Sequence, residues 1–157
     1  MIFGICGKKG SGKDYYAKNI LFPKLNINEP TIILGFADFL KLYALSENLF
    51  TFDELFIEKS EKSRNWMQYY GTDVKRIMDP TYWIKIMENT IKIHQERGIK
   101  NFIITDVRFL NEIDWIHKKN GKIYKIINEN MINNDTHISE NELNNFVDFD
   151  VIIINNF

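Results

Sequence analysis

A glycine-rich stretch that ends in a lysine follows the first apolar segment of the chain. The residues Gly-Lys-Lys-Gly-Ser-Gly-Lys at 7–13 have the GxxxxGK spacing of a phosphate-binding loop. Glycines allow successive backbone N–H groups to point at phosphate oxygens, and the next helix adds the positive end of its dipole. We expect phosphate contacts from Gly7, Lys8, Gly10, Ser11, Gly12 and Lys13. The alternative interpretation is a glycine-rich surface turn.

Two aspartates are candidate magnesium ligands. Asp14 occupies the motif position where serine or threonine usually binds Mg²⁺. A carboxylate there can hold Mg²⁺ directly or through water, although it also brings negative charge close to the phosphates. Asp106 directly follows an apolar segment at 101–105, and an aspartate at a strand end is the usual Mg²⁺-side partner of a phosphate loop. The alternative for Asp106 is to cap the following helix.

Arginine is scarce in this chain, with four arginines among the 20 basic residues. Its planar guanidinium binds phosphates through two parallel hydrogen bonds, which lysine cannot do. Arg108, two residues after Asp106, is therefore expected to bridge phosphates, with a solvated ion pair as the alternative. Arg64 and Arg76 flank a helical segment and are expected to point into a pocket for an acceptor phosphate.

Short apolar, β-branched segments alternate with helical patterns along the chain. The segments span 2–6, 31–36, 102–105, 122–127 and 151–154. They lack regular polar alternation, which is typical of strands covered on both faces. The sequence therefore predicts an α/β fold with a five-stranded parallel sheet. Ligands bind at the carboxyl ends of such strands, so Asp106 should lie near Lys13 if the first and third strands are adjacent.

Helical periodicity predicts two amphipathic helices between the second and third strands. One covers 66–77, with Ile77 on its apolar face, and the other covers 84–91 and is closed by Gly98. A further helix over 110–119 should end at Asn120, which tolerates a left-handed backbone. The excess of helix before the third strand indicates an inserted helical layer, where a second substrate often lies.

Length and composition restrict the class of protein. The 157 residues fit one domain spanning 1–157, and the single Cys6 cannot form an intrachain disulfide. A net charge of −1 disfavours binding to a nucleic acid polymer. No segment approaches the roughly 18 apolar residues of a membrane span, and no export signal is present. We expect a cytoplasmic protein that binds no membrane, and the sequence leaves open whether it forms a homodimer.

Taken in order, these residues resemble the bacteriophage-type deoxynucleoside monophosphate kinase family over nearly the whole chain. An aspartate after the loop lysine is a shared trait of that family. The matching segments are 7–14, 36–38 with 40–41, Gln68, 71–73, Arg76, Trp83, 105–109, 111–112, 137–140 and 150–155.

The resemblance implies a three-layer nucleoside monophosphate kinase-like fold and transfer of the ATP γ-phosphoryl group to a deoxynucleoside monophosphate. Asp14 and Asp106 would organise Mg²⁺, Lys13, Asp106 and Arg108 would serve catalysis, and Asn155 would lie near the adenine of ATP. The acceptor side would comprise Asp38, Lys41, Arg64, Gln68, Arg76 and Arg108.

One departure from the family pattern keeps two alternatives open. Members commonly carry an arginine shortly after the fourth strand, in or near a mobile lid, whereas this chain has no arginine beyond Arg108. The alternatives are a kinase for another small phosphorylated acceptor, such as phosphomevalonate, and a catalytically silent nucleotide-binding protein. The polar loop at 128–138 is expected to close over ATP.

Overall fold

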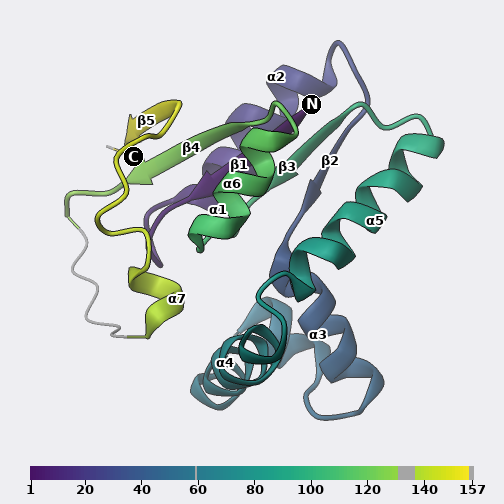
Figure 1. The fold of residues 1–157 in the computed structure, drawn as a ribbon, viewed down its shortest axis with the longest axis vertical. Coiled ribbons are helices and arrows are strands. Elements are labelled where there is room, and N and C mark those ends of the chain that lie inside the picture. Colours follow the sequence, from purple (N-terminus) through teal and green to yellow (C-terminus); the bar gives the residue numbers. More distant parts are fainter. Residues whose placement is uncertain (59, 131–136, 156–157) are drawn as a thin grey trace.

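The computed structural model describes residues 1–58, 60–130 and 137–155, which form an all-parallel sheet with helices around it (Figure 1). The strands are β1 (Ile2–Cys6), β2 (Thr31–Leu34), β3 (Asn101–Ile104), β4 (Lys122–Ile127) and β5 (Val151–Ile154). Their spatial order is β2-β3-β1-β4-β5, and every neighbouring pair is parallel. The predicted α/β fold with five parallel strands is confirmed, and so is the adjacency of β1 and β3.

The helical elements lie between the strands, and η denotes a π-helical segment. They are α1 (Lys13–Tyr16), η1 (Ala17–Leu21), α2 (Phe22–Asn26), α3 (Phe36–Ser46), η2 (Asp53–Ile57), α4 (Glu61–Gln68), η3 (Tyr69–Arg76), α5 (Tyr82–Glu96), α6 (Leu110–Lys118) and α7 (Ile138–Asn141). The elements from α3 to α5 separate β2 from β3, as the expected helical insertion requires. Figure 1 shows α3 and α4 beyond the end of β2, whereas α6 lies over the sheet.

Side chains that alternate along the strands enter two different apolar clusters. Phe3 and Ile5 of β1 pack with Leu21 of η1 on one face of the sheet. Ile2 belongs to the cluster that contains Met87 of α5 on the other face. Since successive strand residues point to opposite faces, both faces of the sheet are covered by helices. The molecule therefore has three layers.

The second strand is shorter than expected, because a helix begins immediately after it. β2 ends at Leu34, and Phe36 is already the first residue of α3. The backbone N–H groups of Phe36 and Ala37 donate to the carboxylate of Asp106. Those N–H groups are among the donors that a helix start leaves without intrahelical partners, so this contact favours helix over strand at 36–37.

The helix expected over 66–77 changes its geometry partway. It is α-helical up to Gln68 and π-helical over Tyr69–Arg76. A π-helix bonds residues five apart instead of four, so each turn holds more residues and the apolar spacing loses its phase. Ile77 is consequently 76% exposed, whereas Arg76 is buried. The prediction that Ile77 lies on the buried face is therefore wrong.

Two other helix ends follow the expected pattern. The segment after α5 turns at Gly98, whose φ is 89°, and the segment after α6 turns at Asn120, whose φ is 55°.

Across the described ranges, no helix is both long and apolar enough to cross a membrane. Of the loop expected to close over ATP, residues 131–136 lie outside the described part of the chain.

Candidate active site

The glycine-rich loop joins β1 to α1 in a tight backbone turn. Gly10 and Gly12 have φ angles of 79° and 87°, in the left-handed region that glycine adopts without strain. A β-carbon on Gly7 would lie 2.5 Å from Ser11 Oγ and 2.7 Å from Ile126 O, so a side chain cannot fit there. The loop backbone is therefore folded as closely as a phosphate-binding loop requires.

A buried hydroxyl in this loop has no partner. Ser11 is 3% exposed, and its Oγ makes no hydrogen bond within the described part of the chain. Buried polar atoms in native proteins nearly always have a partner, so this orphan is accounted for if a ligand oxygen reaches the loop. The residues present thus fit the phosphates of a nucleotide.

Asn155, at the end of β5, holds the loop from the other side. Its Nδ2 donates to Ser11 O at 2.8 Å, and its backbone N donates to Ile127 O at 2.7 Å. Asn155 is only 4% exposed. The structure therefore places this side chain against the phosphate loop, and its expected position near the adenine stays a prediction.

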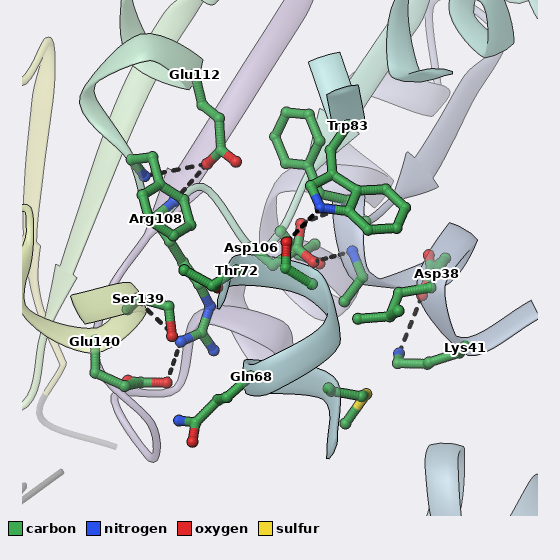
Figure 2. A pocket seen from close by; sticks show the side chains of 18 of the residues that line it. Asp38, Lys41, Gln68, Thr72, Trp83, Asp106, Arg108, Glu112, Ser139 and Glu140 are labelled. Carbon is green, nitrogen blue, oxygen red and sulfur yellow. Dashed lines mark hydrogen bonds and ion pairs between the residues drawn. The ribbon is translucent and has the colours of Figure 1, made fainter. Parts of the chain in front are cut away.

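A cavity of about 300 Å³ opens at the end of the loop (Figure 2). Its lining includes every candidate catalytic, metal-binding and acceptor-side residue: Lys13, Asp14, Asp38, Lys41, Arg64, Gln68, Arg76, Asp106 and Arg108. Gly7 and Lys8 line a second cavity of about 20 Å³, which Arg108 shares. Tertiary folding thus joins the end of the loop to side chains nearly one hundred positions later in the sequence.

Asp106 lies where β3 ends and caps a helix other than the one that follows it. Its two carboxylate oxygens accept hydrogen bonds from Phe36 N at 2.7 Å and Ala37 N at 2.8 Å. The capped helix is α3, which follows the neighbouring strand β2, so the alternative of capping α6 is wrong. Burial raises the pKa of Asp106, and the negative charge of Asp38 adds to that effect, while the two N–H donors and Arg108 oppose it.

The two candidate metal ligands share the cavity. Each oxygen of Asp106 accepts one of these hydrogen bonds, which leaves further lone pairs on the carboxylate. Asp14 lines the same cavity from the start of α1. Within the described ranges, no three His, Cys, Asp or Glu side chains are grouped to hold a metal ion. Oxygen atoms of a bound phosphate would have to complete the coordination of Mg²⁺ here, as is usual for this ion.

Arg76 reaches the cavity wall, where its guanidinium already has partners. Nη2 donates to Asn111 Oδ1 at 2.8 Å and lies 3.4 Å from Glu112 Oε1. The guanidinium carbon is 3.6 Å from the centroid of the Phe109 ring. The Arg76 side chain is 8% exposed. Its contact with an acceptor phosphate stays a prediction, since the structure shows it bound within the wall.

Glu112 is a cavity residue that the sequence analysis did not assign to the site. Its Oε2 accepts hydrogen bonds from Arg108 N at 2.8 Å and Phe109 N at 3.1 Å. Burial raises the pKa of Glu112 to about 7, although Arg76 opposes the rise. The same burial lowers the pKa of Arg76. The available signal was a glutamate three residues after Phe109, the spacing of a helix-capping side chain.

Glu140 is the second residue that the sequence analysis left out of the site. Figure 2 shows its carboxylate beside the guanidinium of Arg108. Oε1 forms an ion pair with Arg108 Nη1 and lies 3.5 Å from Arg64 Nη2. Arg108 Nη1 also donates to Ser139 O at 3.1 Å. The 137–140 match to the kinase family was the signal for Glu140, but nothing local links it to either arginine.

The inserted helices supply the rest of the acceptor side. Lys41 Nζ lies 3.0 Å from Asp38 Oδ1 and 4.5 Å from the centroid of the Phe56 ring. Trp83 presents its ring to the cavity, and its Nε1 donates to Gly71 O at 2.9 Å. The wall therefore combines charged pairs with a fixed aromatic surface.

Comparisons with known proteins agree with this geometry. The model of the deoxynucleotide monophosphate kinase family matches residues 38–157. That match begins after the phosphate loop, so it is independent of the GxxxxGK motif. A protein of Acanthamoeba polyphaga mimivirus with the description "Putative deoxynucleotide monophosphate kinase" is 29% identical over 176 aligned positions, covering 99% of this chain and 89% of that protein. The family match covers most of the chain, so the chain belongs to the deoxynucleotide monophosphate kinase family.

Proposed function

We propose that this protein transfers the γ-phosphoryl group of ATP to a deoxynucleoside monophosphate, giving ADP and a deoxynucleoside diphosphate. One observation carries the proposal: Lys13 of the glycine-rich loop, Arg64 and Arg108 line a single cavity. Phosphoryl transfer requires two phosphates held in line and neutralisation of the charge between them. Membership of the deoxynucleotide monophosphate kinase family supports the choice of acceptor.

The loop would bind the phosphates of ATP. The described residues give Lys13 no hydrogen bond or ion pair to another side chain, so its charge is available for an anion. The backbone N–H groups of 7–13 and the start of α1 add positive ends of dipoles. The orphaned hydroxyl of Ser11 supplies one further donor.

Asp14 and Asp106 would hold Mg²⁺. When bound, this ion supplies positive charge that offsets the charge on phosphate oxygens. The chain keeps Asp106 in place through its bonds to the backbone of α3, so the carboxylate is oriented before any ligand arrives. Such preorganisation lowers the cost of aligning groups during the reaction.

Arg64 and Arg108 would bind the phosphate of the acceptor, and Lys41, Asp38 and Gln68 would contact its nucleoside. The amide of Gln68 can both donate and accept hydrogen bonds, which suits the edge of a base. Arg76 is proposed to act from the wall, where it donates a hydrogen bond to the side chain of Asn111. The apolar surface of the cavity would accommodate the base.

The test is ADP release from Mg-ATP, with each deoxynucleoside monophosphate, its ribonucleotide counterpart and phosphomevalonate offered as separate acceptors. We expect turnover with one or more deoxynucleotides and only background release without an acceptor. Turnover with phosphomevalonate alone would replace the proposed acceptor. ATP binding without turnover for any acceptor would contradict the kinase proposal and favour a silent nucleotide-binding protein.

A further inference from the structure

Arg64 and Arg108 come from separate parts of the fold and meet on one carboxylate. Arg64 belongs to α4 in the inserted helical layer, and Arg108 lies after the carboxyl end of β3. Glu140 of α7 forms ion pairs with both. We propose that Glu140 is a positioning residue that holds the two guanidinium groups as a pair for the acceptor phosphate. The inference rests on the proposed kinase function for the identity of that phosphate.

The pattern of burial places the carboxylate behind the arginines. The Glu140 side chain is 2% exposed, whereas those of Arg64 and Arg108 are 23% and 30% exposed. A carboxylate that occupied the position of the acceptor phosphate would be exposed to the open cavity. Glu140 is instead covered, while the guanidinium groups keep surface for a ligand.

The contacts of Arg108 leave part of its guanidinium for a phosphate. Both of its side-chain hydrogen bonds in the described part of the chain start from Nη1, to Glu140 Oε1 and to Ser139 O. A guanidinium has five N–H donors in a rigid plane, so Nε and Nη2 retain theirs. Anchoring one nitrogen of a planar group sets the direction of the others. Glu140 and the backbone of Ser139 thus orient a two-donor edge.

The residues that make these contacts, one after β3 and two in α7, are shared by the two cavities. Arg108, Ser139 and Glu140 line both the large cavity and the small one beside Gly7 and Lys8. The loop reaches both cavities, with Lys13 in the large one and Gly7 and Lys8 in the small one, so Arg108 is near the loop as well as the acceptor side. A small displacement of Arg108 would therefore change the alignment of two phosphates, to which phosphoryl transfer is sensitive.

A competing role for Glu140 predicts the opposite result. If its carboxylate occupied the site of the acceptor phosphate, removing its charge would strengthen acceptor binding. If it positions the arginines, removing its charge takes the buried counter-charge from Arg108 and weakens the hold on Arg64, and acceptor binding weakens. The sign of the change in affinity distinguishes the two roles.

The experiment compares Glu140→Gln with the wild type and with Glu88→Gln. Glu88 also forms an ion pair, 2.6 Å from Lys119, but it lies outside the lining of both cavities. Steady-state kinetics give KM for the acceptor and for ATP, and calorimetry gives the affinity for the deoxynucleoside monophosphate alone. For Glu140→Gln we expect KM and Kd for the acceptor to rise about 10- to 100-fold, with KM for ATP changed much less. Glu88→Gln should change none of them.

A second variant guards against a folding defect. Glu140→Asp keeps the charge but shortens the side chain by one methylene, so it should restore part of the lost acceptor affinity. Thermal unfolding of each variant identifies loss of structure. If Glu140→Gln does not fold, an unchanged acceptor affinity in Glu140→Asp overturns the proposal.

Each remaining outcome is decisive. Unchanged or tighter acceptor binding in a folded Glu140→Gln overturns the positioning role. Weaker deoxynucleotide binding in that variant supports it even if the wild type gives no turnover, in which case only the kinase function fails. If the wild type binds no deoxynucleoside monophosphate at all, both proposals fail.

Discussion

The two ends of the cavity neutralise charge in different ways. On the acceptor side, Lys41 pairs with Asp38, Arg76 with Glu112, and Arg64 and Arg108 with Glu140. At the phosphate loop, the described residues provide no side-chain partner for Lys13. The loop lysine thus has no ion-paired carboxylate in the described part of the chain, whereas each of the four cations on the acceptor side is paired with one of three carboxylates before any ligand binds.

This difference matches the charge of the proposed ligands. A triphosphate carries more negative charge than a monophosphate, so it gains more from a loop whose lysine is not already paired with a carboxylate. A wall of paired charges gains selectivity instead, because an acceptor must fit among groups that are already oriented by their partners. We therefore expect activity to depend on the lysine charge and the backbone shape at the loop end, and on the ion pairs at the acceptor end.

The largest expected effect is at the unpaired lysine. Lys13→Ala should lower kcat by about 10³-fold, because it removes a donor aimed at the transferred phosphate. The fold should be retained, since no described side chain depends on this amine. ADP release measures the first expectation and thermal unfolding the second. Lys9→Ala, at an exposed position of the same loop, should lower activity far less. Equal activity of Lys13→Ala and wild type would contradict the proposed role of the unpaired lysine at the loop end of the cavity.

The paired end should show its dependence on pH through Glu112. Its pKa is raised from 4.5 to about 7 in the folded protein, so the folded state binds this proton more tightly than the unfolded state. The tighter proton binding stabilises the folded state fully below about pH 4.5, and this stabilisation is lost as the pH rises through 7. Between these two pH values the free energy of unfolding falls by about 3 kcal/mol.

Glu112→Gln cannot ionise and should lack this loss. Denaturant unfolding at pH 4.5 and pH 8 should show the free energy of unfolding of Glu112→Gln gaining about 3 kcal/mol relative to the wild type between the two pH values. Comparing the two proteins cancels the titration of other groups. Parallel pH profiles would mean that Arg76 keeps Glu112 ionised in the folded protein.

The backbone shape of the loop can be tested without changing charge. Gly7→Ala should raise KM for ATP at least about tenfold, because its β-carbon would lie 2.5 Å from Ser11 Oγ and 2.7 Å from Ile126 O. In the matched variant Gly98→Ala, the β-carbon meets nothing within 4 Å, but φ is 89°. Gly98→Ala should lower stability without altering KM. Equal KM values for the two variants would contradict the tight loop.

The smallest effect is expected where the loop is held by the last strand. Asn155→Ala removes the bond to Ser11 O and should cost about 1 kcal/mol of stability. If Asn155 only holds the loop, KM should rise equally for ATP and GTP. If Asn155 also contacts the adenine, the preference for ATP over GTP should fall. Asn19→Ala, which removes an exposed bond to Tyr15 O, is the matched control.

The strands and the loop could be predicted because their signals are local. Apolar, β-branched runs marked β1, β4 and β5 at their observed ends, and the GxxxxGK spacing located the turn between β1 and α1. Glycine adopts the left-handed backbone of such a turn without strain, so the turn can form from the residue type alone. Such local features do not depend on how distant segments of the chain pack.

The exposed position of Ile77 could not be predicted in the same way. Regular α-helical spacing favoured Ile77 as the buried residue, and the π-helical turn over Tyr69–Arg76 changed the phase. The carboxylate of Asp106 was expected at the strand end, where it lies, but its bonds to the start of α3 depend on β2 being the neighbour of β3.

By itself, the sequence determined the α/β class, the five strands, the inserted helices and the place of the glycine-rich loop, since periodicity and glycine spacing act over a few residues. Only the tertiary structure decided which charges share a partner. Glu112 meets Arg76 across 36 positions of the chain, and Glu140 meets Arg108 across 32. Such pairs form only after strand order and helix packing bring distant segments into contact, where burial strengthens electrostatic interactions and makes an unpaired charge costly.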